Sequence, residues 1–164
     1  LGASAMSQLS QALHDPEWQV RKPAAQALAA IGVQAYPAVS DLTQALNDEE
    51  WQVRFCASNA LASIGFHARP AVPRLTAALS DEAWQVRKAA AQALGAIGPN
   101  AASAIPALIK CLDDPEWHCR RVAAQALEKT AQGDRAAIPE IIDALLDPEW
   151  NTRKGVALSL QDKL

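Results

Sequence analysis

Residues 81–98 read DEAWQVRKAAAQALGAIG, and this stretch decides the fold. Apolar residues such as Ala90 and Leu94 recur in it at the spacing of one face of an α-helix. Asp81 is a good N-cap residue, so we expect the helix to begin directly after it. Gly98 stands where helices commonly end. The stretch therefore predicts one amphipathic helix between an aspartate and a glycine.

A shorter helix is expected just before this stretch, roughly from Val72 to Leu79. Leu75 and Leu79 lie one turn apart on one face of it, and Ser80 and Asp81 interrupt it. No run in the sequence alternates apolar and polar residues with the period of two that marks a strand. Residues 66–98 are therefore predicted to form a unit of two helices.

The same unit recurs five times with a period of 33 residues and without insertions. The only tryptophans in the chain are Trp18, Trp51, Trp84, Trp117 and Trp150. Three residues before them stand Asp15, Asp48, Asp81, Asp114 and Asp147. Three residues after them stand Arg21, Arg54, Arg87, Arg120 and Arg153. This regularity predicts a repeat protein with units at about 1–32, 33–65, 66–98, 99–131 and 132–164.

Two helices this short cannot bury their apolar faces alone, so neighbouring units are expected to stack. Asp-Pro-Glu precedes the tryptophan in three units, which predicts a proline at the first helical position. These prolines are Pro16, Pro115 and Pro148. Pro23 lies inside the second helix of the first unit and is expected to kink or shorten it.

The phrases DPEWQVRKPAAQALAAIG, DEAWQVRKAAAQALGAIG and GPNAASAIPALIKCL resemble HEAT repeats, and the resemblance covers the whole chain. It is closest to the short bacterial type, also found in phycobilin lyase subunits and in consensus-designed helical repeat proteins. The resemblance implies an all-α fold, a right-handed α-solenoid of five 33-residue helix-turn-helix HEAT-like repeats. Ankyrin repeats share the period, but their TPLH signature is absent. The constant tryptophan departs from the family pattern.

The resemblance also implies a structural ladder of the constant aspartates and arginines, in which each arginine reaches an aspartate of its own or a neighbouring turn. The guanidinium fork fits a carboxylate at two points. The alternative is a row of five anion-binding sites.

A second column of side chains lies on the same side of the predicted helix as the tryptophans, because four residues make about one turn. The residues four positions after the tryptophans are Lys22, Phe55, Lys88, Arg121 and Lys154. Further along this face are Gln26, Asn59, Gln92 and Gln125. The resemblance places the face on the concave surface, where tryptophan and cations would suit binding of another chain. The alternative is a packing ladder, with each tryptophan lying over the next repeat or over its own lysine stem.

Specificity is expected where the units differ, notably at Phe55 and Cys56 in the second unit and at His118 in the fourth. The alternative is drift on a solvated face. Cys56 is expected to be accessible, whereas Cys111 and Cys119 replace small or branched apolar residues and are expected in the core. An odd number of cysteines without paired spacing predicts a reducing compartment, the cytoplasm.

Fifteen basic and eighteen acidic residues give a net charge of −3, which argues against binding nucleic acid or a membrane through the whole surface. No apolar run approaches the roughly 18 residues of a membrane span. The motifs of nucleotide-binding proteins, hydrolases and metal sites are absent, so we expect no enzymatic activity, no cofactor and no metal.

These observations predict a non-catalytic scaffold that binds a protein or peptide on the concave face of the second helices. An acidic or extended peptide fits the chemistry of that face, and we expect a monomeric module of a longer chain. Two alternatives remain open. One is an accessory or chaperone-like subunit of a phycobilin-lyase-type enzyme, and the other is nucleic-acid binding through the tryptophan and basic stripe.

Overall fold

The computed structural model describes residues 3–131. In chain order the α-helices are α1 (Ala3–Ala12), α2 (Trp18–Ile31), α3 (Val39–Ala45), α4 (Trp51–Ile64), α5 (Val72–Ala78), α6 (Trp84–Ile97), α7 (Ile105–Lys110) and α8 (Trp117–Thr130). Four 3-10 helices join them, namely η1 (Gly32–Ala38), η2 (Gly65–Ala71), η3 (Gly98–Ala104) and η4 (Cys111–Asp113). The prediction of helices without strands is confirmed for residues 3–131.

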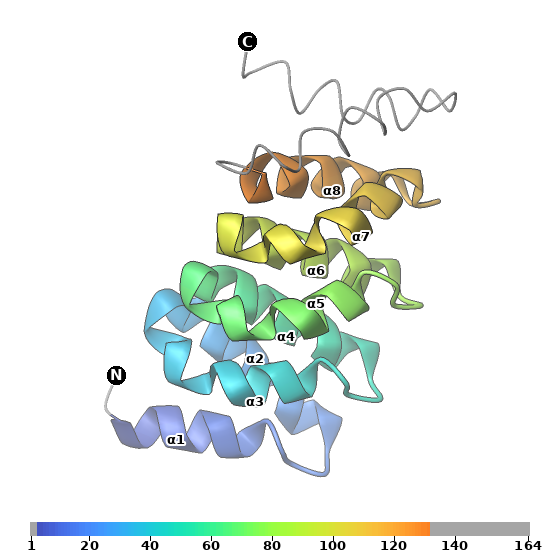
Figure 1. Cartoon of the computed structure of the whole chain (residues 1–164). Coiled ribbons are helices and arrows are strands. Elements are labelled where there is room, and N and C mark those ends of the chain that lie inside the picture. Colours follow the sequence, from blue (N-terminus) through green and yellow to red (C-terminus); the bar gives the residue numbers. More distant parts are fainter. Residues whose placement is uncertain (1–2, 132–164) are drawn as a thin grey trace.

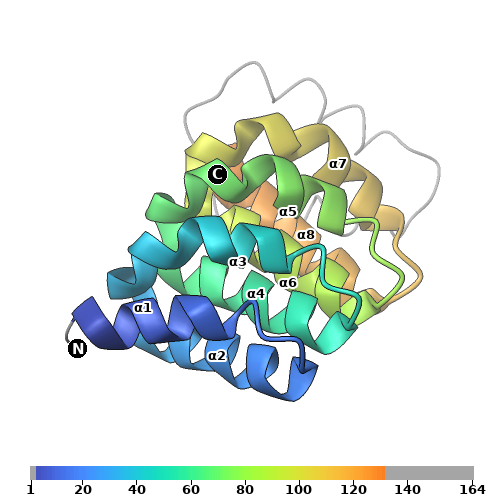
Figure 2. The ribbon, with the colours of Figure 1, turned by 90° about the horizontal axis from the view of Figure 1, so that it is seen from below.

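The helices are arranged in two layers that run along the stack. Figure 1 shows the first helices of the repeats, α1, α3, α5 and α7, following one another from the N-terminus upward. Figure 2 shows the second helices, α2, α4, α6 and α8, forming the other layer. The most extensive contacts between elements join α2 to α4, α4 to α6 and α6 to α8. The predicted α-solenoid of stacked helix-turn-helix repeats is confirmed.

The core is built from columns of leucine that repeat with the sequence period. Each leucine in these columns is at most 1% exposed. The second helices contribute Leu28, Leu61, Leu94 and Leu127, and the first helices contribute Leu42, Leu75 and Leu108. Burial of one such side chain contributes about 1.5–3 kcal/mol. The interface between repeats is therefore the core of the molecule.

The 3-10 helices between repeats were not expected from the sequence. Buried alanines recur in them every three residues, which is the period of a 3-10 helix. These alanines, each 0% exposed, are Ala35, Ala38, Ala68, Ala71, Ala101 and Ala104. The three 3-10 helices η1, η2 and η3 each begin at a glycine with φ between 65° and 73°, a conformation that favours glycine. Gly98 ends α6 as predicted.

The predicted helix starts are wrong by two residues. Asp48 does not cap α4, because the helix begins at Trp51 after an extended Glu50. The Asp48 carboxylate instead accepts a hydrogen bond from the N–H of Glu50 at 2.9 Å, so it closes the turn before the helix. For the same reason Pro16 precedes the N-cap of α2 and is not its first helical residue.

Pro23 does not shorten α2. This helix spans 14 residues with Pro23 inside it, and α4, α6 and α8 also span 14 residues. The predicted fifth repeat, 132–164, lies outside the described residues, and so do Pro148, Asp147, Trp150, Arg153 and Lys154. Within residues 3–131 no helix is long and apolar enough to cross a membrane.

Candidate partner-binding interface

The constant arginines join each repeat to the next one. Arg21 donates from Nε and Nη2 to the two carboxylate oxygens of Asp48, at 2.6 and 2.8 Å. Equivalent two-point contacts, at 2.6 to 3.0 Å, are made by Arg54 with Asp81 and by Arg87 with Asp114. Charged, bidentate pairs of this kind are among the stronger hydrogen bonds in proteins. The arginine of one repeat thus fixes the loop of the following repeat.

The same arginines also fix the loop of their own repeat. Nη1 of Arg21 donates to the carbonyl oxygens of Asp15 and Pro16, both at 2.8 Å. Arg120 makes the corresponding bonds to the carbonyls of Asp114 and Pro115, at 2.7 and 3.0 Å. Each of these guanidinium groups is therefore occupied by groups of the protein itself, which favours a structural role over a row of anion sites.

The surroundings of these ion pairs shift their pKa values. A hydrogen bond to Asp114 raises the pKa of Arg87 above its ordinary value. Burial alone would raise the pKa of Asp114. Hydrogen bonds from Arg87 and from the N–H of Glu116 lower this pKa by more than burial raises it, so it lies below the ordinary value of 3.8. Both partners are thus held in their charged forms.

The second helices also carry the tryptophan column, on a face that starts in the first turn of each helix. We call it the second-helix face, made of the described tryptophans and the residues four and eight positions after them. It consists of Trp18, Trp51, Trp84, Trp117, Lys22, Phe55, Lys88, Arg121, Gln26, Asn59, Gln92 and Gln125. None of these twelve residues is buried. Trp117 is 51% exposed and Trp51 is 36% exposed, so these two rings are accessible to a partner, whereas Trp18 and Trp84 are half-buried.

The tryptophans have different neighbours along the column. Nζ of Lys22 lies 6.0 Å from the ring centroid of Trp18, which also packs against the core. In the next repeat, the rings of Trp51 and Phe55 are 6.5 Å apart. Each tryptophan therefore offers a partner a different local surface, although the residue itself is constant.

His118 gives the fourth repeat its own arrangement. Its ring stacks on Trp84 at 5.3 Å between centroids and lies 3.7 Å from the ring of Trp117. The guanidinium of Arg121 lies 5.4 Å from the ring centroid of Trp117, so the row continues from His118 through Trp117 to Arg121. Nδ1 of His118 is 2.6 Å from a carboxylate oxygen of Glu116, and the hydrogen bond lowers the pKa of Glu116. This row of four side chains bridges α6 and α8.

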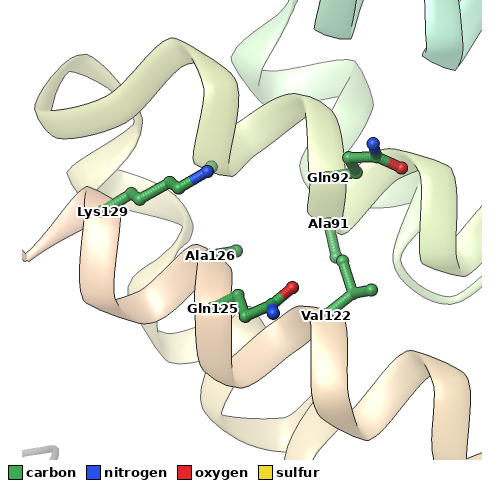
Figure 3. Close-up of a pocket in the computed structure, with 7 residues that line it drawn as sticks. Ala91, Gln92, Val122, Gln125, Ala126 and Lys129 are labelled. Carbon is green, nitrogen blue, oxygen red and sulfur yellow. The ribbon is translucent and has the colours of Figure 1, made fainter. Parts of the chain in front are cut away.

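A shallow pocket lies on the second-helix face between α6 and α8. Figure 3 shows Gln92 and Gln125 on its two sides and Lys129 reaching from α8 towards α6. A Cβ at Gly95 would lie 3.0 Å from Cα of Ala126, so glycine is needed for this close approach. Sequence analysis missed Gly95 and Lys129.

A signal for both residues was present in the repeat pattern. The counterparts of Gly95 in the first two repeats are Ala29 and Ala62. Those of Lys129 in the first three repeats are Ala30, Ser63 and Ala96. A departure from the pattern of the other repeats therefore marked this pocket, which Gly95 and Lys129 both line.

The expectation that Cys56 is accessible is wrong, because Cys56 is only 3% exposed. Burial raises the pKa of its thiol. Cys111 and Cys119 are buried as predicted, and burial raises both of their pKa values to about 11. Thiols of this kind are poor nucleophiles at neutral pH. No cluster of potential metal ligands occurs in the described part of the chain.

Comparison with known proteins identifies one family. The sequence profile of HEAT repeats matches residues 6–70, 63–128 and 105–162. These segments together cover most of the chain and include all five tryptophans. No curated protein matches the sequence.

Three solved structures illustrate the similarity of fold. An engineered protein is 25% identical with a TM-score of 0.76, over 95% of this chain and 78% of that one. A designed armadillo repeat protein in complex with the peptide (KR)4 is 21% identical with a TM-score of 0.75, over 94% and 80%. One chain of the complex of CpcE and CpcF of phycocyanin lyase from Nostoc sp. PCC7120 is 22% identical with a TM-score of 0.64, over 96% of this chain and 99% of that one.

Proposed function

The chain belongs to the HEAT-repeat family, and we propose that it is a non-catalytic scaffold that binds another protein through the second-helix face. One observation carries the proposal. No described tryptophan of the column is fully buried, and Trp51 and Trp117 are exposed. A cation, Lys22, Lys88 or Arg121, stands one turn after three of the four tryptophans, and bidentate ion pairs hold the repeats in register.

The chemistry of the face favours a partner with acidic groups in an extended segment. Tryptophan and arginine contribute much of the binding energy at protein interfaces. Lys88 and Arg121 add positive charge, whereas Gln92 and Gln125 supply amides that can both donate to and accept from a peptide backbone. A face held rigid before binding also loses less conformational freedom on association. These properties suit recognition of a protein segment.

The similar structures support the same kind of function. The designed armadillo repeat protein binds a peptide, and CpcE and CpcF bind one another. Repeat solenoids with this arrangement are typical of interaction scaffolds, because stacking produces an extended surface.

The test is selection of binding peptides on the full chain, followed by measurement of each peptide by fluorescence anisotropy. We expect at least one class of selected peptides to lose about thirtyfold in affinity with Trp117→Ala, as for a hot-spot residue. The same class should weaken with Arg121→Ala.

The matched control is Arg74→Ala, because Arg74 is an exposed arginine of α5, on the first-helix layer. This variant should leave affinity within about twofold. Peptides that bind Trp117→Ala and Arg121→Ala as well as the original chain would contradict the proposal.

A second candidate function is a subunit of a bilin lyase, favoured by the nearly complete mutual coverage with one chain of the CpcE–CpcF complex. The buried Cys56 thiol offers no accessible attachment point for a bilin, so any bilin would be held without a bond to it. The discriminating measurement is the absorbance of phycocyanobilin mixed with the full chain. A shifted and intensified long-wavelength band would favour this candidate over the scaffold.

A further inference from the structure

A second group of accessible aromatic side chains lies away from the second-helix face, on the 3-10 helices between repeats. Tyr36 in η1 is 58% exposed and Phe66 in η2 is 52% exposed. His67 and Arg69 of η2 are exposed as well. We call these four residues the turn patch. Tyr36 and Phe66 are among the most exposed large hydrophobic residues in the described chain.

The four side chains form a continuous row across two repeats. The rings of Tyr36 and His67 lie 5.5 Å apart. Phe66 meets His67 edge-on at 5.6 Å. The guanidinium of Arg69 lies 6.0 Å from the ring centroid of Phe66, within the range of a cation–π contact. The row leaves aromatic faces and one cation open to solvent.

The packing of the repeats does not account for the turn patch. The buried alanines of η1 and η2 make the core contacts of these segments. In η3 the positions of Phe66, His67 and Arg69 are occupied by Pro99, Asn100 and Ala102. Because η3 takes the same fold without aromatic residues, the aromatic row is a property of two repeats and not of the architecture. Exposed apolar groups that are clustered in this way mark interaction sites.

The charge around the turn patch indicates the chemistry of its partner. Segments 30–38, 63–71 and 96–104 contain no acidic residue. Arg69 has no carboxylate within salt-bridge distance among residues 3–131. Ten of the twelve acidic residues in residues 3–131 instead lie in the loops before the second helices. Each of these loops is separated from the 3-10 turn of its repeat by the full length of a 14-residue helix, about 21 Å.

We infer that the turn patch is a second docking surface, and that its occupant is an acidic segment of a partner protein carrying an aromatic or large apolar side chain. The apolar side chain packs on the rings of Tyr36 and Phe66, and a neighbouring carboxylate pairs with Arg69. An exposed arginine that already stacks on a ring is held in place for such a carboxylate. This surface is separate from the second-helix face and does not depend on the function proposed for it.

The test is a phage-displayed library of random peptides of about twelve residues, selected on the full chain and in parallel on the Tyr36→Ser/Phe66→Ser/Arg69→Gln variant. We expect one class of peptides to be enriched on the original chain alone. Its consensus should combine aspartate or glutamate with an aromatic or large apolar residue. Circular dichroism checks that the triple variant keeps its helical content.

Two single variants keep the test informative if the triple variant fails to fold. Arg69→Glu replaces an exposed cation with an anion and should weaken these peptides by about tenfold. Arg74→Glu, the matched charge reversal on α5, should change affinity by less than about twofold. Trp117→Ala should leave this class of peptides unaffected, whereas it removes the class that binds the second-helix face.

Several results would overturn the inference. One is the absence of any peptide class that depends on the turn patch, and another is a basic or uncharged consensus. Peptides that respond to Trp117→Ala but not to Arg69→Glu would place all binding on the second-helix face. Binding of phosphatidylserine vesicles that is lost with Arg69→Glu, with no peptide class affected, would assign the patch to a membrane surface instead.

Discussion

The aspartate–arginine column and the tryptophan column are equally constant in sequence, yet the structure treats them differently. The three described ion pairs repeat the same two-point geometry, with hydrogen bonds of 2.6 to 3.0 Å. The tryptophans instead meet a lysine, a phenylalanine or a histidine, depending on the repeat. Constancy of a residue therefore does not by itself indicate constancy of its contacts.

The difference lies in where the partner of each residue comes from. Aspartate and arginine are both constant, so each junction within residues 3–131 contains a complete pair whose side chains are mostly buried. Tryptophan is constant, but the residue one turn later changes from Lys22 to Phe55 to Lys88 to Arg121. The arginines and aspartates pair with one another, so their columns stabilise the array. The tryptophans have neighbours that change from repeat to repeat, so their column gives each repeat a distinct surface.

The largest effect is expected from Arg54→Ala. It would leave the carboxylate of Asp81, whose side chain is 10% exposed, without its guanidinium partner. Removal of one member of a buried pair typically costs about 3 kcal/mol or more of unfolding free energy. Urea unfolding followed by circular dichroism measures the loss. Arg54→Lys should recover part of it, because lysine keeps the charge but not the fork.

The control for Arg54→Ala is Arg74→Ala, since Arg74 is exposed and hydrogen bonds only Asn47 at 3.2 Å among the described residues. This variant should change the unfolding free energy by no more than about 0.5 kcal/mol. Equal losses in the two variants would show that the ladder does not stabilise the array.

The next effect is a dependence of stability on acid pH. Because the pKa of Asp114 is lowered on folding, its contribution is complete above the ordinary value of 3.8 and disappears as the pH falls through the lowered value. The original chain should exceed Asp114→Asn by about 2 kcal/mol at neutral pH, as for hydrogen bonds to a charged group. Urea unfolding between neutral and strongly acid pH should show this difference shrinking below the ordinary pKa. A difference that persists unchanged would refute the role of the charge.

The smallest effect on stability is expected from Trp117→Ala. Trp117 is 51% exposed, so its loss should cost about 1 kcal/mol or less. Trp18→Ala should cost more, because Trp18 packs against the core. Urea unfolding followed by circular dichroism avoids reliance on tryptophan emission. Should Trp117→Ala destabilise the chain as much as Arg54→Ala, the tryptophan column would be a packing ladder after all.

The sequence was sufficient to predict those features that depend on local periodicity. The two helices of the unit, the end of α6 at Gly98 and the burial of Cys111 all followed from spacing within one repeat. The helix starts were predicted two residues too early, because an aspartate can either cap a helix or close the turn before it. Asp15 and Asp48 both close the turn. The 3-10 helices were missed because alanine at every third position is not distinctive in an alanine-rich chain.

The burial of Cys56 shows why repeat position matters. Its counterpart in the third repeat, Ala89, is 1% exposed, whereas its counterpart in the first repeat, Pro23, is exposed. The helix α4 has a second helix on each side, but α2 contacts a second helix on one side only within the described residues. A single repeat does not contain this information, so the sequence of the second unit alone could not place the thiol.

The sequence by itself determined the period, the pairing of helices and the columns of identical residues, because these depend on spacing along one helix. The tertiary structure decided which members of a column are buried. Val20 and Val53 occupy the same column, yet Val20 is 40% exposed and Val53 is 0% exposed. Burial depends on the neighbours that stacking supplies on both sides of a helix, and stacking is a property of the array and not of the repeat.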